Sequence, residues 1–343
     1  MKAIVKSKPL PGVEYIEVKE PKIQSNEVLI KVKAAAICGS DIGIFDYTSA
    51  YSKMKLPVIM GHEFAGQVTD IGERVHSYKV GDRVISESVK ACGVCPFCRS
   101  GHANLCNSST LFGIHTDGGF AEYIAVPADL LHPLPESLTY EEGALIEPLS
   151  NALHFVKDCT PISIGDFVVV QGCGPIGIFS AQLLQLAGAE VIITGVGVDK
   201  ERFKIAESLG FETINIEKQD LVDVVLGYTA GKGADVAFVA TGAPPAVTQA
   251  TQIVKKRGHI TVIGIFGKPV EVPMTQVVRR EITLAGAYDA KPENFIQSIK
   301  LAEGHAVKIR ELITHRFSLE DAVQAFEVAK SRVGCKVEFI MRL

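Results

Sequence analysis

The stretch that decides the fold reads Gly172-Cys173-Gly174-Pro175-Ile176-Gly177. It follows an apolar segment that predicts a strand (166–171) and opens a segment that predicts a helix (175–187). A G-x-G-x-x-G pattern in this context is typical of a dinucleotide-binding turn, because its glycines permit a tight turn and close approach to a pyrophosphate. The N-terminus of the helix offers free N–H groups to that anion. The pattern therefore assigns cofactor binding to Gly172, Gly174, Pro175, Ile176 and Gly177.

The segment 190–194 predicts the next strand, and the first acidic residue after it is Asp199. An acidic side chain near this point binds the ribose hydroxyls of NAD. Alternatively, Gly195 leaves room for a 2′-phosphate that Lys200 or Arg202 would pair. A third interpretation is a solvated helix start with Asp199 as its N-cap. We expect NAD, with NADP not excluded.

Two kinds of pattern divide the chain near residue 150. Before it, short alternating segments predict strands at 27–33, 66–71 and 79–85, and residues 86–118 show little periodicity. After it, helices and strands alternate, which indicates βαβ units and a doubly wound parallel sheet. Helices are expected at 150–157, 175–187, 199–209, 246–256, 292–304 and 319–331, and strands at 166–171, 190–194, 234–240, 259–264 and 335–341.

Composition excludes several classes of protein. The 343 residues are 47% hydrophobic and 22% charged, which excludes a disordered chain. A net charge of −4 argues against a nucleic-acid binder and an electrostatic membrane anchor. Residues 167–189 carry no charge, but their glycines, proline and glutamines favour a strand, a turn and a buried helix over a membrane span. No signal-peptide pattern opens the sequence, so we expect a cytoplasmic protein with reduced thiols.

Four of the eight cysteines follow the spacing C-x2-C-x2-C-x7-C. Four thiolates this close in sequence can surround one zinc ion and leave no open position, which predicts a structural metal site. Iron–sulfur proteins share part of this cysteine spacing, so an iron–sulfur cluster is an alternative to zinc. A disulfide pair or a nucleic-acid-binding zinc finger fits less well. The residues are Cys92, Cys95, Cys98 and Cys106.

Three further segments each follow an apolar stretch: Cys38-Gly39-Ser40-Asp41, Gly61-His62-Glu63 and Glu147-Pro148. Each alone has an ordinary explanation as a core cysteine, a structural histidine or a helix cap. Together with the cysteine loop, the glycine turn and the segment 118–123, they resemble the zinc-dependent medium-chain dehydrogenase/reductase family. The resemblance is to its sorbitol and L-threonine dehydrogenase branch and spans essentially the whole chain.

The resemblance implies an α/β protein of two domains. A chaperonin-10-like (GroES-like) β-rich catalytic domain would comprise residues 1–153 and 289–343, and a Rossmann domain residues 154–288. It implies one catalytic and one structural zinc per subunit, NAD or NADP, and a homotetramer or homodimer. Carried over by position, the catalytic metal site takes Cys38, His62, Glu63 and Glu147, the last directly or through water, and Ser40 begins a proton relay.

Two positions depart from the family pattern. Gly43 stands where relatives commonly carry a histidine at the outer end of the proton relay, so the proton would leave through ribose and water, or through Asp46 or Tyr47. The segment 286–289 lacks the arginine that sorbitol dehydrogenases tend to carry, which argues against sorbitol itself.

The resemblance implies hydride transfer between a secondary alcohol and NAD(P), giving a ketone. The alcohol would be a polyol, a sugar acid or a sugar-alcohol derivative. Activity on L-threonine, or a non-catalytic nucleotide- and zinc-binding sensor on the same scaffold, are the alternatives. No nucleic-acid or membrane partner is expected.

Overall fold

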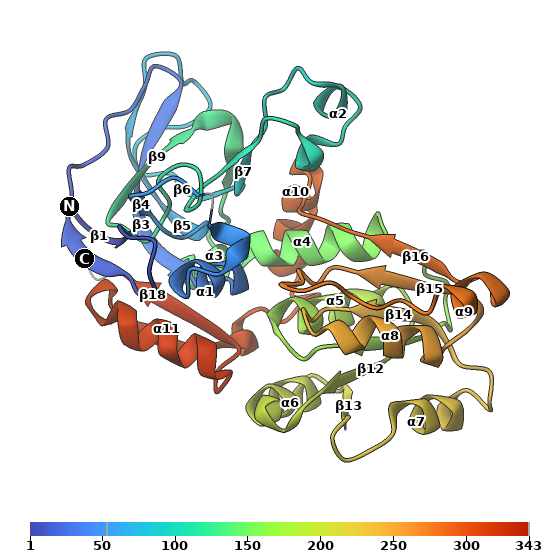
Figure 1. Ribbon diagram of the computed structural model, residues 1–343. Coiled ribbons are helices and arrows are strands. Elements are labelled where there is room, and N and C mark those ends of the chain that lie inside the picture. The colour runs from blue at the N-terminus through green and yellow to red at the C-terminus, as the bar shows by residue number, and fades with distance from the viewer. Residues whose placement is uncertain (53, 342–343) are drawn as a thin grey trace. The chain divides into compact units, whose positions relative to one another are not determined.

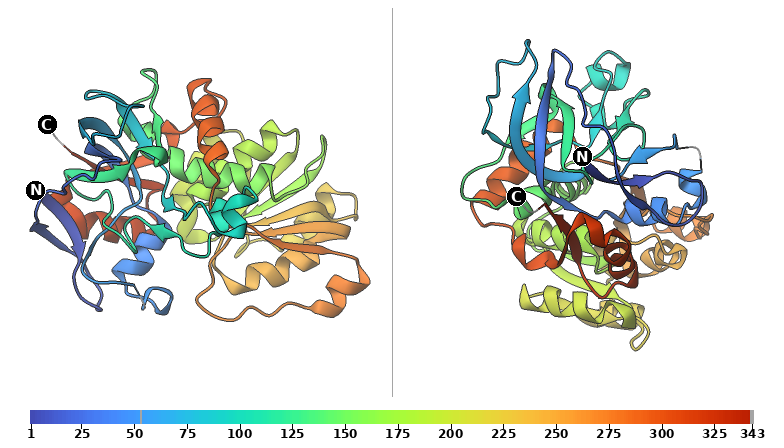
Figure 2. Two further views of the ribbon diagram at one scale, coloured as in Figure 1. Left: turned by 90° about the horizontal axis from the view of Figure 1, so that it is seen from above. Right: turned by 90° about the vertical axis from the view of Figure 1, so that its left-hand side faces the viewer.

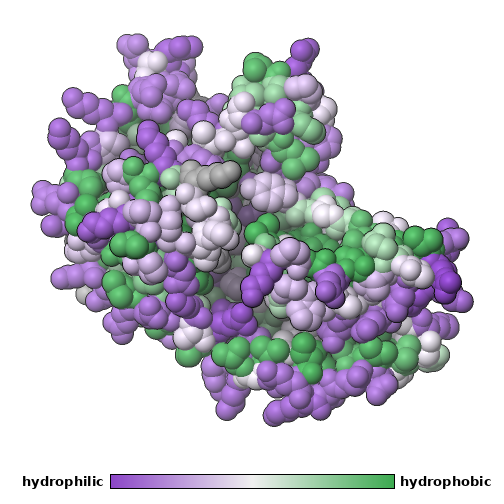
Figure 3. Space-filling model, viewed as in Figure 1, coloured by the Kyte–Doolittle hydropathy of each residue, from purple (hydrophilic) through white to green (hydrophobic). Residues whose placement is uncertain are grey.

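The computed structural model describes residues 1–52 and 54–341 (Figure 1). These residues form two compact units. The first unit comprises Met1–Ser150 and Lys291–Leu343, and the second comprises Asn151–Ala290. Helix α4 (Ile146–Lys157) carries the chain from one to the other. No helix of the described residues is both long and apolar enough to cross a membrane. Hydrophilic residues cover most of the face drawn in Figure 3.

The first unit is built mainly on antiparallel strands, although its last two strands pair in parallel. Its larger sheet has the order β10-β6-β5-β3-β18-β17, with β9 also paired to β3, and a smaller sheet has the order β2-β1-β4. The strands are β1 (Lys2–Lys6), β2 (Glu14–Glu17), β3 (Glu27–Ala36), β4 (Val58–Ile59), β5 (Glu63–Ile71), β6 (Arg83–Ser86), β7 (Val89–Lys90), β8 (Thr110–Leu111), β9 (Tyr123–Pro127), β10 (Leu131–Pro133), β17 (Ile313–Phe317) and β18 (Lys336–Ile340).

Short helices join these strands. They are α1 (Gly39–Phe45), α2 (Pro96–Arg99), α3 (Tyr140–Ala144), α10 (Pro292–Glu303) and α11 (Ala322–Ser331), with single 3-10 turns at Ser49–Tyr51, Ala103–Leu105, Ala128–Leu130, Arg310–Leu312 and Leu319–Asp321.

The end of the chain completes this first sheet. Strand β18 pairs with β3 through Glu338 and Ala36, so the dark red C-terminal strand lies beside the blue N-terminal strands in Figure 2. Strand β3 buries every second side chain, as its alternating sequence predicts. Aromatic rings pack together in the core of this unit, and the ring centroids of Phe120 and Phe339 lie 5.0 Å apart.

The second unit is a six-stranded parallel sheet with the order β13-β12-β11-β14-β15-β16. Numbered within the unit, this is the 3-2-1-4-5-6 order of a Rossmann fold. The elements are β11 (Phe167–Gln171), α5 (Pro175–Leu186), β12 (Glu190–Gly195), a 3-10 turn at Gly197–Asp199, α6 (Lys200–Ser208), β13 (Glu212–Asn215), α7 (Leu221–Tyr228), β14 (Ala234–Val239), α8 (Pro244–Ile253), β15 (Val254–Val262), α9 (Met274–Arg279) and β16 (Thr283–Gly286).

Several element boundaries differ from the sequence prediction, and two of these differences have a clear structural cause. The helix expected at 246–256 ends at Ile253, and residues 254–256 already belong to β15. That strand pairs irregularly with β14, and Arg257 has a φ of 61°, so the apolar pattern at 259–264 revealed only its second half. The strand expected at 79–85 begins at Arg83, because residues 79–82 form a turn with Gly81 at a φ of 97°.

Candidate metal centres and dinucleotide site

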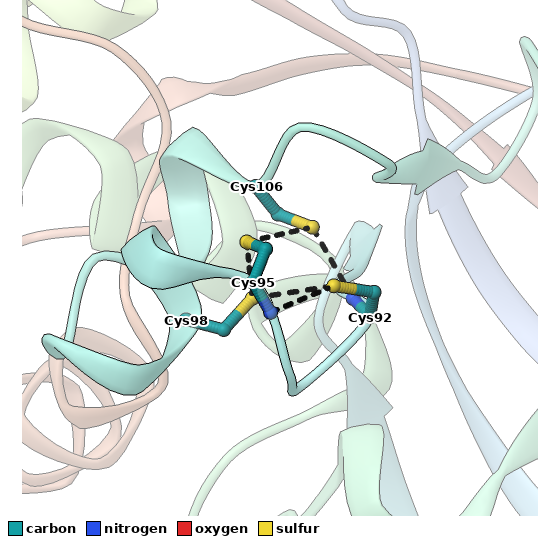
Figure 4. A group of neighbouring side chains, drawn as sticks. All are labelled: Cys92, Cys95, Cys98 and Cys106. Atoms are coloured by element: carbon teal, nitrogen blue, oxygen red, sulfur yellow. Dashed lines mark hydrogen bonds between the residues drawn. The ribbon is translucent and has the colours of Figure 1, made fainter.

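The sulfurs of the four-cysteine loop surround one point (Figure 4). Cys95 Sγ lies 3.5 Å from Cys98 Sγ and 3.9 Å from Cys106 Sγ, and Cys92 Sγ lies 4.0 Å from Cys98 Sγ. Zinc–sulfur bonds of about 2.3 Å in a tetrahedron would place sulfurs roughly 3.8 Å apart. A disulfide would need about 2.05 Å. The spacing therefore fits one tetrahedral ion rather than a disulfide or a cluster of several irons.

Backbone N–H groups donate hydrogen bonds to several of these sulfurs. Cys95 is the N-cap of α2, with Pro96 at its first turn, and its own N–H donates to Cys92 Sγ at 3.4 Å. The N–H of Cys92 donates to Cys106 Sγ at 3.3 Å. Hydrogen bonds from the backbone of Cys98 and Asn107 lower the pKa of Cys95 to about 6. Donors aimed at sulfur favour the charged form that binds metal.

A second group joins Cys38, His62 and Glu63, whose ligand atoms all lie within 4.8 Å of one another. Sheet register causes this meeting, because Ala36 at the end of β3 pairs with Glu63 at the start of β5. Cys38 follows β3 directly as the N-cap of α1. His62 and Glu63 are 5% and 1% exposed, and Cys38 is half-buried.

The charges around this group are mainly negative. Burial opposes the charged form of His62, but Asp41, Cys38 and Glu147 together raise its pKa well above the usual value. Burial raises the pKa of Glu63 to about 7 although Lys336 opposes the shift. Nδ1 of His62 and Oδ1 of Asp41 are buried without a hydrogen-bond partner. A buried, anion-rich set of sulfur, nitrogen and oxygen donors fits a divalent zinc ion.

Glu147 and Ser40 belong to the surroundings of this group but not to its set of ligand atoms. Within residues 1–52 and 54–341, Glu147 is not part of the set whose ligand atoms lie within 4.8 Å. Its charge nevertheless raises the pKa of His62 and Lys336. The Oγ of Ser40 is buried without a hydrogen-bond partner, so it can accept a bond from a bound molecule.

Sequence reasoning missed two charged residues here. Asp41 Oδ2 accepts the N–H of Cys38 at 2.9 Å, while Oδ1 faces His62. The ammonium of Lys336 forms a buried ion pair with Glu63 and donates to the carbonyl of Ile37 at 3.2 Å. The only signal for Lys336 was a lysine inside the apolar segment 335–341. Its position next to Glu63 depends on the pairing of β18 with β3, which local pattern does not reveal.

Each glycine of the dinucleotide turn meets a different requirement. Gly172 has a φ of 118°. A Cβ on Gly177 would lie 2.0 Å from the carbonyl oxygen of Gly172, so helix α5 packs closely against the turn. A Cβ on Gly174 would meet nothing within 4 Å, which leaves open space at the N-terminus of α5. Pro175 takes the first turn of that helix, and Ile176 follows it. These are the three roles that the fingerprint predicts.

Asp199 folds back towards the end of β12. Its Oδ2 accepts the N–H of Val196 at 3.1 Å and would lie 3.1 Å from a Cβ on Gly195. Its Oδ1 lies 3.6 Å from Nη1 of Arg202. Asp199 is 5% exposed, so it is not simply a solvated helix start, whereas Lys200 is exposed. Asp199 therefore stands where the ribose-binding acid of an NAD site is expected, and Arg202 is engaged with it.

The structure also shows what surrounds the two positions that depart from the family pattern, Gly43 and the segment 286–289. The ring of Tyr51 takes the space beside Gly43, since a Cβ there would lie 2.6 Å from Tyr51 Cε2. Asp46 pairs with Lys330 at 2.7 Å. The hydroxyl of Tyr47 donates to the carbonyl of Ser52 at 3.1 Å. Both groups considered for proton release are thus engaged elsewhere. In the segment 286–289, Gly286 ends β16 and Asp289 has a φ of 54°.

Comparison with known proteins agrees with both units. Residues 24–136 match the alcohol dehydrogenase GroES-like domain, and residues 175–304 match the zinc-binding dehydrogenase domain. The chain is 35% identical over 341 residues to sorbitol dehydrogenase of Halalkalibacterium halodurans, covering 98% of both chains. It is 35% identical over 344 residues to L-threonine 3-dehydrogenase of Bacillus subtilis (strain 168), covering 99% of this chain and 98% of the relative.

A solved structure from Sinorhizobium meliloti 1021, assigned as a zinc-binding dehydrogenase and bound to NADP, superposes with a TM-score of 0.92. It is 30% identical, and the match covers 99% of both chains. The two units and their sites thus define a zinc-type alcohol or polyol oxidoreductase that uses NAD(P). The chain belongs to the zinc-dependent medium-chain dehydrogenase/reductase family, in its sorbitol and L-threonine dehydrogenase branch. The resemblance, the fold class and the zinc and NAD(P) cofactors predicted from sequence are confirmed.

Proposed function

We propose that this enzyme oxidises a secondary alcohol that carries a neighbouring polar group, such as a polyol, and that Cys38, His62 and Glu63 hold its catalytic zinc. The observation that carries the proposal is the buried meeting of their ligand atoms within 4.8 Å. When bound, zinc supplies a Lewis acid that lowers the pKa of an alcohol oxygen, and the nicotinamide accepts the hydride. Glu147 assists through a water molecule.

The surrounding side chains orient this site and move the proton. The carboxylate of Asp41 faces Nδ1 of His62 and so favours the tautomer whose Nε2 is the free donor atom. Lys336 fixes one oxygen of Glu63. Ser40 accepts the proton of the substrate hydroxyl at its otherwise unpartnered Oγ. Gly43 provides no side chain and Asp46 is paired with Lys330, so the proton would leave Ser40 through water or, with the cofactor bound, through a ribose hydroxyl.

The direct test follows reduced-nicotinamide absorbance with zinc-loaded protein and a panel of polyols, sugar acids and L-threonine. We expect turnover on at least one polyol. Cys38→Ala should abolish turnover and remove one of two bound zinc ions, while Cys335→Ala, buried outside both cysteine groups, should retain both. Substantial activity in Cys38→Ala would overturn the ligand assignment. Bound zinc and cofactor without turnover on any alcohol would favour the non-catalytic sensor. A preference for L-threonine over the polyols would favour the threonine dehydrogenase alternative.

We propose NAD as the preferred cofactor. The support is the buried carboxylate of Asp199 at the end of β12, with Arg202 paired to it instead of open for a 2′-phosphate. Asp199→Ala should lower kcat/KM for NAD by about tenfold or more while leaving or improving that for NADP. Measuring both cofactors in parallel checks this, with Asp223→Ala on helix α7 of the same unit as the matched control. A wild-type preference for NADP would contradict it.

We propose a homodimer or homotetramer in a reducing, cytoplasmic setting. Strand β16 is the outer strand of its sheet and is largely exposed, and an open strand edge invites pairing with another strand. Leu284 on this strand is 40% exposed and Val278 on the preceding helix is 70% exposed. Leu284→Asp should shift the sedimentation velocity profile towards smaller species. An unchanged profile would exclude this edge as the interface.

A further inference from the structure

A cysteine, a histidine and an aspartate meet in the second unit, apart from both candidate metal groups. His154 lies in the last turn of α4, and Asp158 and Cys159 follow the end of that helix. Cys159 Sγ lies 3.5 Å from Nε2 of His154, and Nδ1 of the same ring lies 2.8 Å from Asp158 Oδ2. A nucleophile, a base and a group that orients the base therefore stand in hydrogen-bond reach of one another.

Neighbouring hydrogen bonds fix the segment that carries the thiol. The buried hydroxyl of Thr160 donates to the carbonyl of Phe155 at 2.7 Å and lies 2.8 Å from the Thr261 hydroxyl on β15. The ring of His259, on the same strand, hydrogen-bonds to the backbone of Cys159. The side chain of His154 is only 5% exposed. The cluster is thus held in place by the sheet behind it.

The arrangement favours removal of the thiol proton. The carboxylate of Asp158 accepts the Nδ1–H of His154, so Nε2 is the nitrogen that faces sulfur and can take its proton. Charged and titratable groups near the thiol include His154, Asp158 and His259, and the ammonium of Lys157 lies 4.0 Å from Asp158.

Access distinguishes Cys159 from the other cysteines. Cys173 and Cys335 are 1% and 6% exposed. Five others belong to the two groups that can hold a metal ion. Among the described residues, Cys159 is the only cysteine outside those groups that is not buried. Outside the two metal groups, Cys159 is therefore the described cysteine best placed to meet a small reagent.

We propose that Cys159 is a modification site, a thiol that exchanges with small disulfides such as oxidised glutathione. His154 takes the thiol proton, and the Cys159 thiolate attacks one sulfur of the disulfide. A new sulfur–sulfur bond forms as the original one breaks, and the departing thiolate takes up a proton. The disulfide is the oxidant, the product is a mixed disulfide on Cys159, and added thiol reverses the reaction.

The experiment uses the zinc-loaded full chain and an aromatic disulfide whose released thiolate absorbs visible light. We expect one fast-reacting thiol per chain, lost in Cys159→Ser and kept in Cys335→Ser. Peptide mapping after treatment with oxidised glutathione should locate the adduct on Cys159. A fast phase that persists in Cys159→Ser, or an adduct mapped elsewhere, would overturn the proposal.

The role of the histidine has a separate signature in the pH profile. At pH 6 we expect His154→Gln and Asp158→Asn to react about tenfold slower than wild type. The difference should shrink towards pH 9, where a thiol loses its proton to water without the help of His154. Asp158→Asn covers the case in which the buried His154 variant does not fold. Equal rates at pH 6 for wild type and a folded variant would overturn the activation by His154.

Discussion

Oδ1 of Asp41 lies 3.9 Å from Nδ1 of His62, and neither of these two atoms has a hydrogen-bond partner among the described residues. Asp41 is fully buried and also accepts the backbone N–H of Cys38. The side chain of Asp41 thus faces one candidate zinc ligand, His62, and binds the backbone of a second, Cys38. A carboxylate in this position sets the tautomer and the orientation of a ligating histidine and increases its basicity.

Asp41→Asn should therefore weaken zinc binding at the catalytic site by about 10–100-fold. The amide keeps the size of the side chain and its bond to Cys38 but removes the negative charge that faces His62. Chelator competition followed by metal analysis measures the effect, with Asp46→Asn on the same helix as control. If the zinc affinity of the site formed by Cys38, His62 and Glu63 is the same in Asp41→Asn and wild type, Asp41 does not have this orienting role.

The four-cysteine loop should be tested by its effect on stability. Cys95→Ser should remove one zinc ion and lower the thermal midpoint by roughly 5–10 °C, because metal binding contributes directly to folding. Cys335→Ser makes the same exchange of sulfur for oxygen at a buried position outside the loop and should retain both ions. Equal zinc content in Cys95→Ser and wild type would exclude the loop as a metal site.

Local sequence pattern was sufficient to predict much of the fold and one of the two candidate metal sites. The glycine turn, the alternation of strands and helices and the cysteine spacing each depend on neighbours within about fifteen residues, so the Rossmann sheet order and the grouped sulfurs agree with them. The meeting of Cys38 with His62 and Glu63 could be expected only through family resemblance. Its physical cause is the long-range register of β3 and β5, which places Ala36 opposite Glu63.

Other features depend on contacts that no local pattern encodes. Lys336 meets Glu63 only because the last strand pairs with the third one. The early start of β15 at Val254 was hidden because an irregular pairing with β14 interrupts its alternation. Tyr51 fills the space beside Gly43 from a turn outside helix α1, so sequence alone left the proton exit open.

The space beside Gly43 predicts a steric effect. Gly43→Ala should destabilise the first unit by about 1–3 kcal/mol, because the added methyl group would lie 2.6 Å from the ring of Tyr51. Gly227→Ala in helix α7 meets nothing within 4 Å and should be neutral or stabilising. In a Tyr51→Ala background the penalty of Gly43→Ala should disappear, a coupling that a double-mutant cycle measures by urea unfolding. Additive effects of the two substitutions would contradict the contact.

Glu338 should make stability depend on pH. It is fully buried on β18, neither carboxylate oxygen has a hydrogen-bond partner among the described residues, and burial together with the charge of Glu141 raises its pKa well above the usual value. The folded protein therefore favours the protonated acid. This contribution to stability is complete below the unfolded pKa of about 4.3 and is lost as pH rises through the folded value.

Glu338→Gln removes that titration, since the amide stays neutral at every pH. The free energy of unfolding of the variant should gain on that of wild type as pH rises from 5 to 8, by at most about 1.4 kcal/mol per pH unit. Urea unfolding at a series of pH values measures the difference, and Glu327→Gln on the exposed side of α11 provides the control. If the curves of wild type and Glu338→Gln run parallel between pH 5 and 8, Glu338 is already ionised in the folded protein.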